Sequence, residues 1–328
     1  MAVKEGDWSG RWLHANVRRG DVISVHWPSF LYYVPESRPR TYWNLLRFCV
    51  FMLALRARGA RIVWTAHNLY PHDGGKAVLA HRIARQVVAR LASLVAVHGS
   101  SSATRVGREF AVSSSRLLLI EHGNWLGFYA NTLTRDAARR RLDIPAAAFV
   151  FLFIGLCKPY KNLEQLLRGH AALSDDSLLW IVGRFQSPAY RAAVRHAASL
   201  AAPGRTTIRD EFVKSDDLQL YLNACDAVVL PYREILTSGA AMLALSFGRP
   251  VVAPRMGTLE ELVTEDCGVL YDPGRDGALT AALRKARTRR FGSDRIFARA
   301  GQFSWDRSAG AFVDRGLATR TTRAATGE

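Results

Sequence analysis

Short apolar runs and longer mixed segments alternate along the chain. The runs are rich in Val, Ile and Leu and stop at Gly, Pro, His or a charged residue, a pattern typical of buried strands. We therefore predict strands at 21–27, 61–66, 94–98, 116–120, 149–155, 178–182, 207–209, 227–230, 251–253 and 268–271. Helices are predicted at 41–58, 77–92 and 240–247, and another begins at 100–102. This alternation predicts an α/β fold with parallel sheets covered by helices on both faces.

Length and one polar segment together predict two domains. A chain of 328 residues can bury two cores of ordinary size. The segment 132–145 is polar and rich in Arg, and it ends at a proline, which is typical of a junction. We predict an N-terminal domain at 1–145, a C-terminal domain at 146–317 and a disordered tail at 318–328.

The formal charge of +17 is concentrated in the first half of the chain, where residues 1–145 hold 21 Lys and Arg against 9 Asp and Glu. A basic region of this kind suits nucleic acid, anionic lipid or a phosphorylated substrate, and a codon bias toward Arg would also produce it. The basic residues are not interleaved with aromatic residues, which argues against nucleic acid. An anionic membrane surface therefore stays among the expected partners.

Several features predict a cytoplasmic protein, with a peripheral place on the inner face of the cytoplasmic membrane as a refinement. The chain starts without the apolar core of a signal peptide. Its apolar run 48–55 is too short for a bilayer, which needs about 20 residues, so it is interpreted as a core helix or, alternatively, an interfacial element. Four widely spaced cysteines in apolar surroundings predict buried thiols in a reducing compartment.

Ligands of open parallel sheets gather at the carboxyl ends of the strands, so the loops there hold the candidate residues of the C-terminal domain. Lys158 and Lys161 follow one strand, and their ammonium groups suit a nucleotide diphosphate. Thr237, Ser238 and Gly239 begin a helix, where they form an anion site or where a hydroxyl only caps the helix. Two further candidates have equally simple structural alternatives. Arg184 contacts a ligand or faces solvent, and Glu261 binds a ligand or only favours the dipole of the helix that it begins.

Histidines mark the corresponding loops of the N-terminal domain. His67 directly follows a predicted strand and shares its loop with His72 and Asp73, so three candidate catalytic groups lie within seven residues. Each could act as a base, and His67 could instead bond a sugar hydroxyl or cap the next helix. The other expected members of the same edge are His26, Trp27, His98 and His122. No histidine pair has the spacing of a zinc site and no Asp-x-Asp motif is present, so we expect a mechanism without a metal.

The stretch 230–254, LPYREILTSGAAMLALSFGRPVVAP, resembles the donor-binding segment of family 4-like glycosyltransferases of the GT-B fold. The two glutamates usual in that segment are absent, since their positions hold Ile235 and Leu243. The Thr-Ser-Gly loop, with the His-Trp-Pro and His-Asn-Leu-Tyr-Pro-His segments, is more similar to a sub-group of bacterial exopolysaccharide (xanthan-type) GDP-mannose:glycolipid β-mannosyltransferases. The resemblance implies two Rossmann-like domains facing a cleft, with the N-terminal domain reduced or its start placed too late.

The resemblance also implies roles for individual residues. Lys161 matches the family lysine on the donor diphosphate, and Lys158 is inferred to replace an arginine because Leu156 holds that position. His67 matches a histidine that faces the donor sugar. The remaining implied donor contacts are the nucleobase at Phe212 and Val213, the ribose at Glu261 and the phosphates at the loop of His122.

The function expected from these observations is transfer of a hexose, with GDP-mannose as the first candidate donor, to a polyprenyl-linked glycan or other sugar acceptor in polysaccharide biosynthesis. The nucleotide sugar is a substrate, and no cofactor is expected. Two alternatives stay open at this point: a sugar-nucleotide epimerase of the same fold, and a non-catalytic partner of another glycosyltransferase.

Overall fold

The computed structural model describes residues 5–71, 77–201 and 203–317. The chain forms two compact units, and the expected tail lies outside the described residues. The N-terminal unit comprises Met1–Glu121 and Asp306–Glu328, and the C-terminal unit comprises His122–Trp305.

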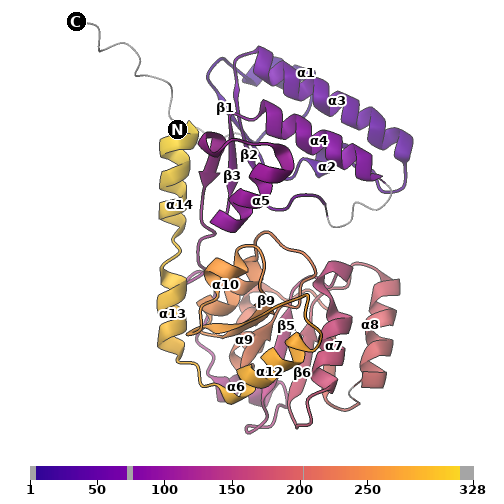
Figure 1. The fold of residues 1–328 in the computed structure, drawn as a ribbon, viewed down its shortest axis with the longest axis vertical. Helices are drawn as coiled ribbons and strands as arrows, with labels where there is room; N and C mark the ends of the chain where they lie inside the picture. Colours follow the sequence, from indigo (N-terminus) through magenta and orange to yellow (C-terminus); the bar gives the residue numbers. More distant parts are fainter. Residues whose placement is uncertain (1–4, 72–76, 202, 318–328) are drawn as a thin grey trace, which may run out of the picture. The chain divides into compact units, whose positions relative to one another are not determined.

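The N-terminal unit is a four-stranded parallel sheet in the order β1-β2-β3-β4. Its elements are α1 (Gly10–Asn16), β1 (Val22–Val25), α2 (Ser29–Tyr32), α3 (Arg38–Ala57), β2 (Arg61–Thr65), α4 (Val78–Leu91), β3 (Leu94–Val97), α5 (Ser100–Phe110) and β4 (Leu117–Leu119). Ser37 caps α3 by accepting a hydrogen bond from Arg40 N, and Pro39 favours its first turn. Helices α3 and α4 pack side by side (Figure 1). From the end of the chain, α14 (Trp305–Ala311) leads into a π-helical turn (Phe312–Leu317), and Phe312 packs on the core of this sheet.

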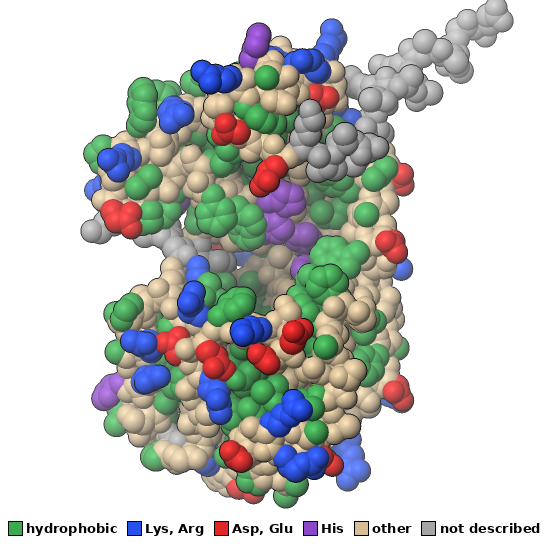
Figure 2. Space-filling view, turned by 180° about the vertical axis from the view of Figure 1, so that it is seen from behind, with side chains coloured by type: hydrophobic (Ala, Val, Ile, Leu, Met, Phe, Trp, Pro, Cys, Tyr) green, Lys and Arg blue, Asp and Glu red, His purple; other side chains and the backbone are tan. Residues whose placement is uncertain are grey.

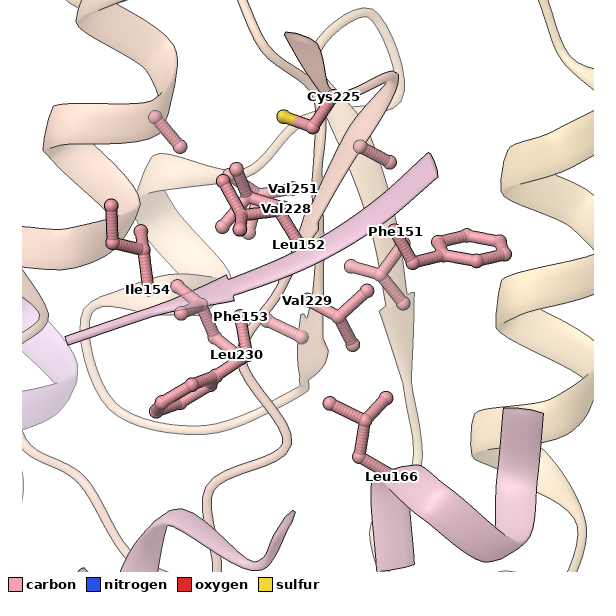
Figure 3. Close-up of a cluster of buried hydrophobic side chains, with 14 of the residues drawn as sticks. Phe151, Leu152, Phe153, Ile154, Leu166, Cys225, Val228, Val229, Leu230 and Val251 are labelled. Atoms are coloured by element: carbon pink, nitrogen blue, oxygen red, sulfur yellow. The ribbon is translucent and has the colours of Figure 1, made fainter. Parts of the chain in front are cut away.

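The C-terminal unit contains a six-stranded parallel sheet in the order β10-β9-β8-β5-β6-β7. Its strands are β5 (Val150–Ile154), β6 (Leu178–Val182), β7 (Thr206–Arg209), β8 (Ala227–Val229), β9 (Val251–Pro254) and β10 (Gly268–Tyr271). Its helices are α6 (Arg135–Arg141), α7 (Leu163–Ala171), α8 (Pro188–Ala201), α9 (Leu218–Ala224), α10 (Gly239–Ser246), α11 (Leu259–Leu262), α12 (Ala278–Thr288) and α13 (Ser293–Gly301). Every residue of β5 is buried, and Figure 3 shows the strand packed among side chains of β8 and β9. The predicted strands and the doubly covered α/β architecture are confirmed.

The boundary between the units differs from the predicted junction at 145/146. Residues 122–145 belong to the C-terminal unit, because Ala138, Leu142 and Ile144 are buried in its core. Arg139 is buried as well, and its guanidinium donates to Asp226 Oδ2 at 2.7 Å and to four backbone carbonyls. The arginine-rich segment 132–145 was interpreted as a linker, but one of its arginines, Arg139, bonds the segment to the sheet.

The apolar run 48–55 is the middle of α3, which buries one side and leaves another exposed. Across the described parts of the chain, every helix is too short or too polar to cross a membrane. All four cysteines are free thiols; three are buried and Cys49 is half-buried.

Candidate active site

The strand order of the C-terminal unit reverses between β5 and β8. From β5 the chain builds outward through β6 and β7, then returns to the other side of β5 and continues through β8, β9 and β10. The loops after β5 and β8 therefore leave the same edge of the sheet in opposite directions, which opens a crevice between them. The residues after these two strands are where a ligand of this unit is expected.

Lys161 lies in this crevice, in the 3-10 turn Pro159–Lys161 that follows β5. Its Nζ is 4.0 Å from the ring centroid of Tyr232, which follows β8, and 4.8 Å from that of Tyr160. Burial lowers the pKa of Lys161, because few water molecules solvate the ammonium. An ammonium held on aromatic faces and away from water attracts an anion strongly.

The N-terminus of α10 forms the other side of the crevice. Ser238 is the N-cap, and its Oγ accepts a hydrogen bond from Ala241 N at 3.2 Å and shares another with the Tyr232 hydroxyl at 3.2 Å. Capping thus describes what Ser238 does in this structure. The N–H groups of Gly239 and Ala240 precede the first intrahelical donors, so they are available to an anion.

Arg233 is a candidate that the sequence analysis missed. Its backbone N–H donates to Tyr160 O at 2.9 Å and its Nε donates to Asn162 Oδ1 at 3.0 Å. The guanidinium of an exposed residue is thereby fixed beside the turn that carries Lys161. The available signal was its place in the stretch that holds Thr237, directly after a buried strand.

Two glycines let the neighbouring loops approach each other after β5 and β6. Gly183 has a φ of +150°, and a Cβ there would lie 1.8 Å from Gly155 O. Lys158 is half-buried on the β5 side of this contact, whereas Arg184 is exposed on the β6 side.

The other expected donor contacts are spread over further loops of the same unit. Phe212 follows β7 with 75% of its surface exposed, and Val213 beside it is half-buried. Glu261 lies in α11, whose end is tied down by the Arg299 guanidinium, which donates to the carbonyls of Glu261 and Leu262.

His122 belongs to the C-terminal unit, whereas His26, His67 and His98 belong to the N-terminal unit. Its Nδ1 donates to Gly123 O at 2.8 Å, and a Cβ on Gly239 would lie 3.3 Å from its Nε2. Burial lowers the pKa of His122, so a neutral ring stands beside the first turn of α10.

The histidines of the N-terminal unit come together at the carboxyl ends of three adjacent strands. His26 Nδ1 is 3.1 Å from His67 Nε2, and His67 Nδ1 is 3.2 Å from His98 Nε2. His98 Nδ1 donates to Ile120 O at 3.1 Å. Figure 2 shows histidine side chains grouped at the surface of this unit, next to large hydrophobic side chains.

Trp27 completes this group by stacking on the His67 ring, with the ring centroids 4.5 Å apart and the planes 12° apart. Partial burial lowers the pKa of His26, which keeps part of its ring at the surface. His72 and Asp73, the other expected catalytic residues, lie outside the described residues. Among the described side chains, no group of three His, Cys, Asp or Glu could hold a metal ion.

Comparison with known proteins shows the family to which this chain belongs. Residues 148–288 match the family described as Glycosyl transferases group 1. A GDP-mannose:glycolipid 4-beta-D-mannosyltransferase from Xanthomonas campestris pv. campestris is 30% identical over 276 residues, which cover 82% of this chain and 72% of that protein.

Two solved structures share the fold at 19% sequence identity. Sucrose-phosphate synthase from Thermosynechococcus elongatus gives a TM-score of 0.72 over 90% of this chain and 72% of its own. Anabaena HepE in complex with UDP gives 0.71 over 90% of this chain and 78% of its own. With the relative that covers most of its length, these findings show that the chain belongs to the group 1 glycosyltransferases of the GT-B fold.

Proposed function

We propose that this glycosyltransferase binds the diphosphate of a nucleotide hexose between β5 and β8 and transfers the hexose to a lipid-linked glycan or other sugar acceptor. One observation carries the donor site: Lys161, Arg233 and the first turn of α10 meet where the strand order reverses. GDP-mannose is the favoured donor and a glycolipid the favoured acceptor, because the Xanthomonas relative carries both in its name.

The residues of the crevice match the charge that develops when the sugar leaves. As the bond from the anomeric carbon to the diphosphate breaks, negative charge grows on the phosphate oxygens. Lys161 and Arg233 offset that charge, and the N–H groups of Gly239 and Ala240 donate to the same oxygens. Because cations and helix donors supply this stabilisation, we propose that departure of the diphosphate needs no metal ion.

Nucleotide binding to purified protein tests the donor site. The thermal unfolding temperature is measured with GDP, UDP, GDP-mannose, UDP-glucose and UDP-glucuronate, and transfer to a lipid-linked acceptor is then followed with the nucleotide that binds. A ligand at 100 times its dissociation constant stabilises by about 2.7 kcal/mol, which is readily measured. Stabilisation by one nucleotide and its sugar conjugate supports the proposal. No stabilisation by any of the five contradicts it.

We further propose that the outer side of α3 docks on an anionic membrane, where a lipid-linked acceptor would reside. Trp43, Leu46, Val50 and Leu53 are each more than half exposed. Their spacing of three, four and three residues places them on one stripe of the helix. An exposed apolar stripe of this length is unusual on a protein surface unless something covers it.

Charge favours a bilayer of anionic lipid as the occupant of this surface. Arg40 and Arg47 are exposed and border the stripe on one side of the helix. Residues 1–121 contain 17 Lys and Arg against 7 Asp and Glu. An interfacial helix usually combines two kinds of side chain: apolar ones enter the headgroup region, and arginines beside them contact lipid phosphates.

Sedimentation with vesicles tests the membrane surface. We expect the protein to bind vesicles containing phosphatidylglycerol and to bind pure phosphatidylcholine vesicles weakly. The triple variant Leu46→Gln, Val50→Gln and Leu53→Gln should lose most of the binding, whereas Leu200→Gln, which alters a still more exposed leucine on α8, should not. Equal binding of the triple variant and the wild type would contradict this assignment.

A further inference from the structure

The histidines at the ends of β1, β2 and β3 form one continuous hydrogen-bonded chain. Its contacts run from Ser24 Oγ to His26 Nε2 at 3.1 Å, and then through His67 and His98 to Ile120 O. A carbonyl can only accept, so His98 Nδ1 carries a proton and, in a neutral ring, His98 Nε2 does not. His67 Nδ1 must then donate to His98, and His26 Nδ1 must donate to His67. All three neutral rings are thereby fixed as the Nδ1–H tautomer, with every N–H directed toward Ile120.

We propose that this chain is a proton relay, in which His26 takes the proton from the acceptor hydroxyl and His98 holds the resulting positive charge. The inference rests on the proposed glycosyl transfer, because forming the bond from the acceptor oxygen to the anomeric carbon releases the hydroxyl proton. His67 is then a positioning and relaying residue in the middle of the chain, not the base that meets the substrate. Both of its ring nitrogens already face other histidines.

The proton steps balance without any further reactant. The acceptor hydroxyl takes the place of the exposed Ser24 hydroxyl at His26 Nε2 and gives its proton to that nitrogen, and His26 Nδ1 passes its own proton to His67 Nε2. His67 Nδ1 then passes its proton to His98 Nε2, so His98 ends as an imidazolium that donates to Ile120 O and to His67. After the product leaves, the same steps run backward and His26 releases the proton to water.

The surrounding structure holds the rings in line for these steps. The rings come from three adjacent strands whose register is fixed by parallel pairing. Trp27 stacks on His67 and limits its rotation. At the inner end, Ile120 N donates to Val97 O at 2.8 Å, which fixes the carbonyl that sets the direction of the chain. A lowered pKa keeps His26 neutral and able to accept a proton at neutral pH.

Glutamine in place of His98 separates proton transfer from ring positioning. In His98→Gln the side-chain Oε1 can still accept from His67 Nδ1, but it cannot take up a proton. We expect kcat to fall by about 100-fold, a typical contribution of general-base catalysis, with the KM for the donor within about twofold of the wild type. His26→Gln should have the same effect, and His196→Gln, on an exposed face of α8, should leave kcat unchanged.

Nitrogen-15 NMR of the resting protein supplies a readout that a merely structural role would not give. The three rings should each show a protonated Nδ1 and an unprotonated Nε2, and an Nε2–H tautomer at His67 would contradict the relay. Wild-type kcat in His98→Gln would also overturn the relay while leaving the proposed function intact. If the wild type transfers no sugar from any nucleotide that it binds, the proposed function fails, and the relay fails with it.

Discussion

The two sheets differ in the order in which the chain adds their strands. In the N-terminal unit, spatial order follows chain order from β1 to β4, whereas in the C-terminal unit it reverses beside β5. The reversal creates a crevice between diverging loops, and Lys161 and Arg233 lie beside it. Without a reversal, the polar groups of the N-terminal unit stand side by side at consecutive strand ends and bond to one another. In the C-terminal unit the strand order indicates where the candidate site lies. In the N-terminal unit the hydrogen-bonded histidines indicate it.

The largest expected effect is a loss of stability on changing Arg139, which tests whether residues 122–145 belong to the C-terminal unit. Arg139→Met should destabilise the C-terminal unit by about 3 to 5 kcal/mol, because four backbone carbonyls lose a buried donor and the half-buried carboxylate of Asp226 keeps Arg135 alone as its charged partner. Hydrogen exchange followed by mass spectrometry should show faster exchange in α6, β5 and α9. Arg140→Ala, at the exposed neighbouring position, should change exchange little. Faster exchange confined to β1–β4 would return residues 122–145 to the N-terminal unit.

The next largest effect concerns the crevice. Lys161→Ala should lower kcat/KM for sugar transfer by about 100- to 1000-fold, since a preorganised cation next to the leaving diphosphate is removed from a partly dehydrated place. The control is Lys285→Ala, which removes an exposed lysine from α12. Steady-state kinetics with the donor identified by thermal unfolding measures the change. A decrease in kcat/KM of less than about threefold would mean that the donor does not bind where the strand order reverses beside β5.

Acid should weaken the C-terminal unit through His170, which is fully buried and donates from Nε2 to Ser177 O at 3.0 Å. Burial lowers the pKa of His170 to about 4. The unfolded chain takes up this proton near pH 6.5 and the folded unit does not, so stability present above pH 6.5 is lost as the pH falls toward 4. Between pH 7 and pH 5 the loss should be about 2 kcal/mol.

Urea unfolding at the two pH values measures this loss. His170→Gln should flatten the pH dependence, whatever its effect on stability at pH 7, while His196→Gln should keep the wild-type slope. An unchanged slope in His170→Gln would assign the acid sensitivity to other groups of the molecule.

Hydrophobic patterning predicted the elements well, because each strand is a short run of Val, Ile and Leu bounded by residues that stop it. It failed at 132–145, where Arg residues dominate and the apolar positions are few. Ala138, Leu142 and Ile144 are sufficient to bury that segment, and a buried Arg139 cannot be told from a solvated arginine until its partners are known.

The site could be predicted in part for a similar reason. Loops after strands are visible in the sequence, so Lys161 and the histidines were named. Which loops meet depends on strand order, and in the C-terminal unit this brought Arg233 to Asn162. The tautomer of each histidine depends on one carbonyl, that of Ile120, and no pattern of residues records it.

The smallest effect decides between the two interpretations of Ser238. Its Oγ is engaged by Ala241 N and the Tyr232 hydroxyl, so Ser238→Ala should cost about 1 kcal/mol of stability, the usual value of a lost cap. The dissociation constant of the nucleotide should change by less than about twofold, because the N–H groups of Gly239 and Ala240 remain in place. Urea unfolding and nucleotide titration of the same variant measure the two quantities. A tenfold weaker affinity at unchanged stability would instead make the hydroxyl a direct ligand of the diphosphate. The site beside β5 would then depend on a side chain as well as on backbone N–H groups, as the histidine chain depends on its side chains.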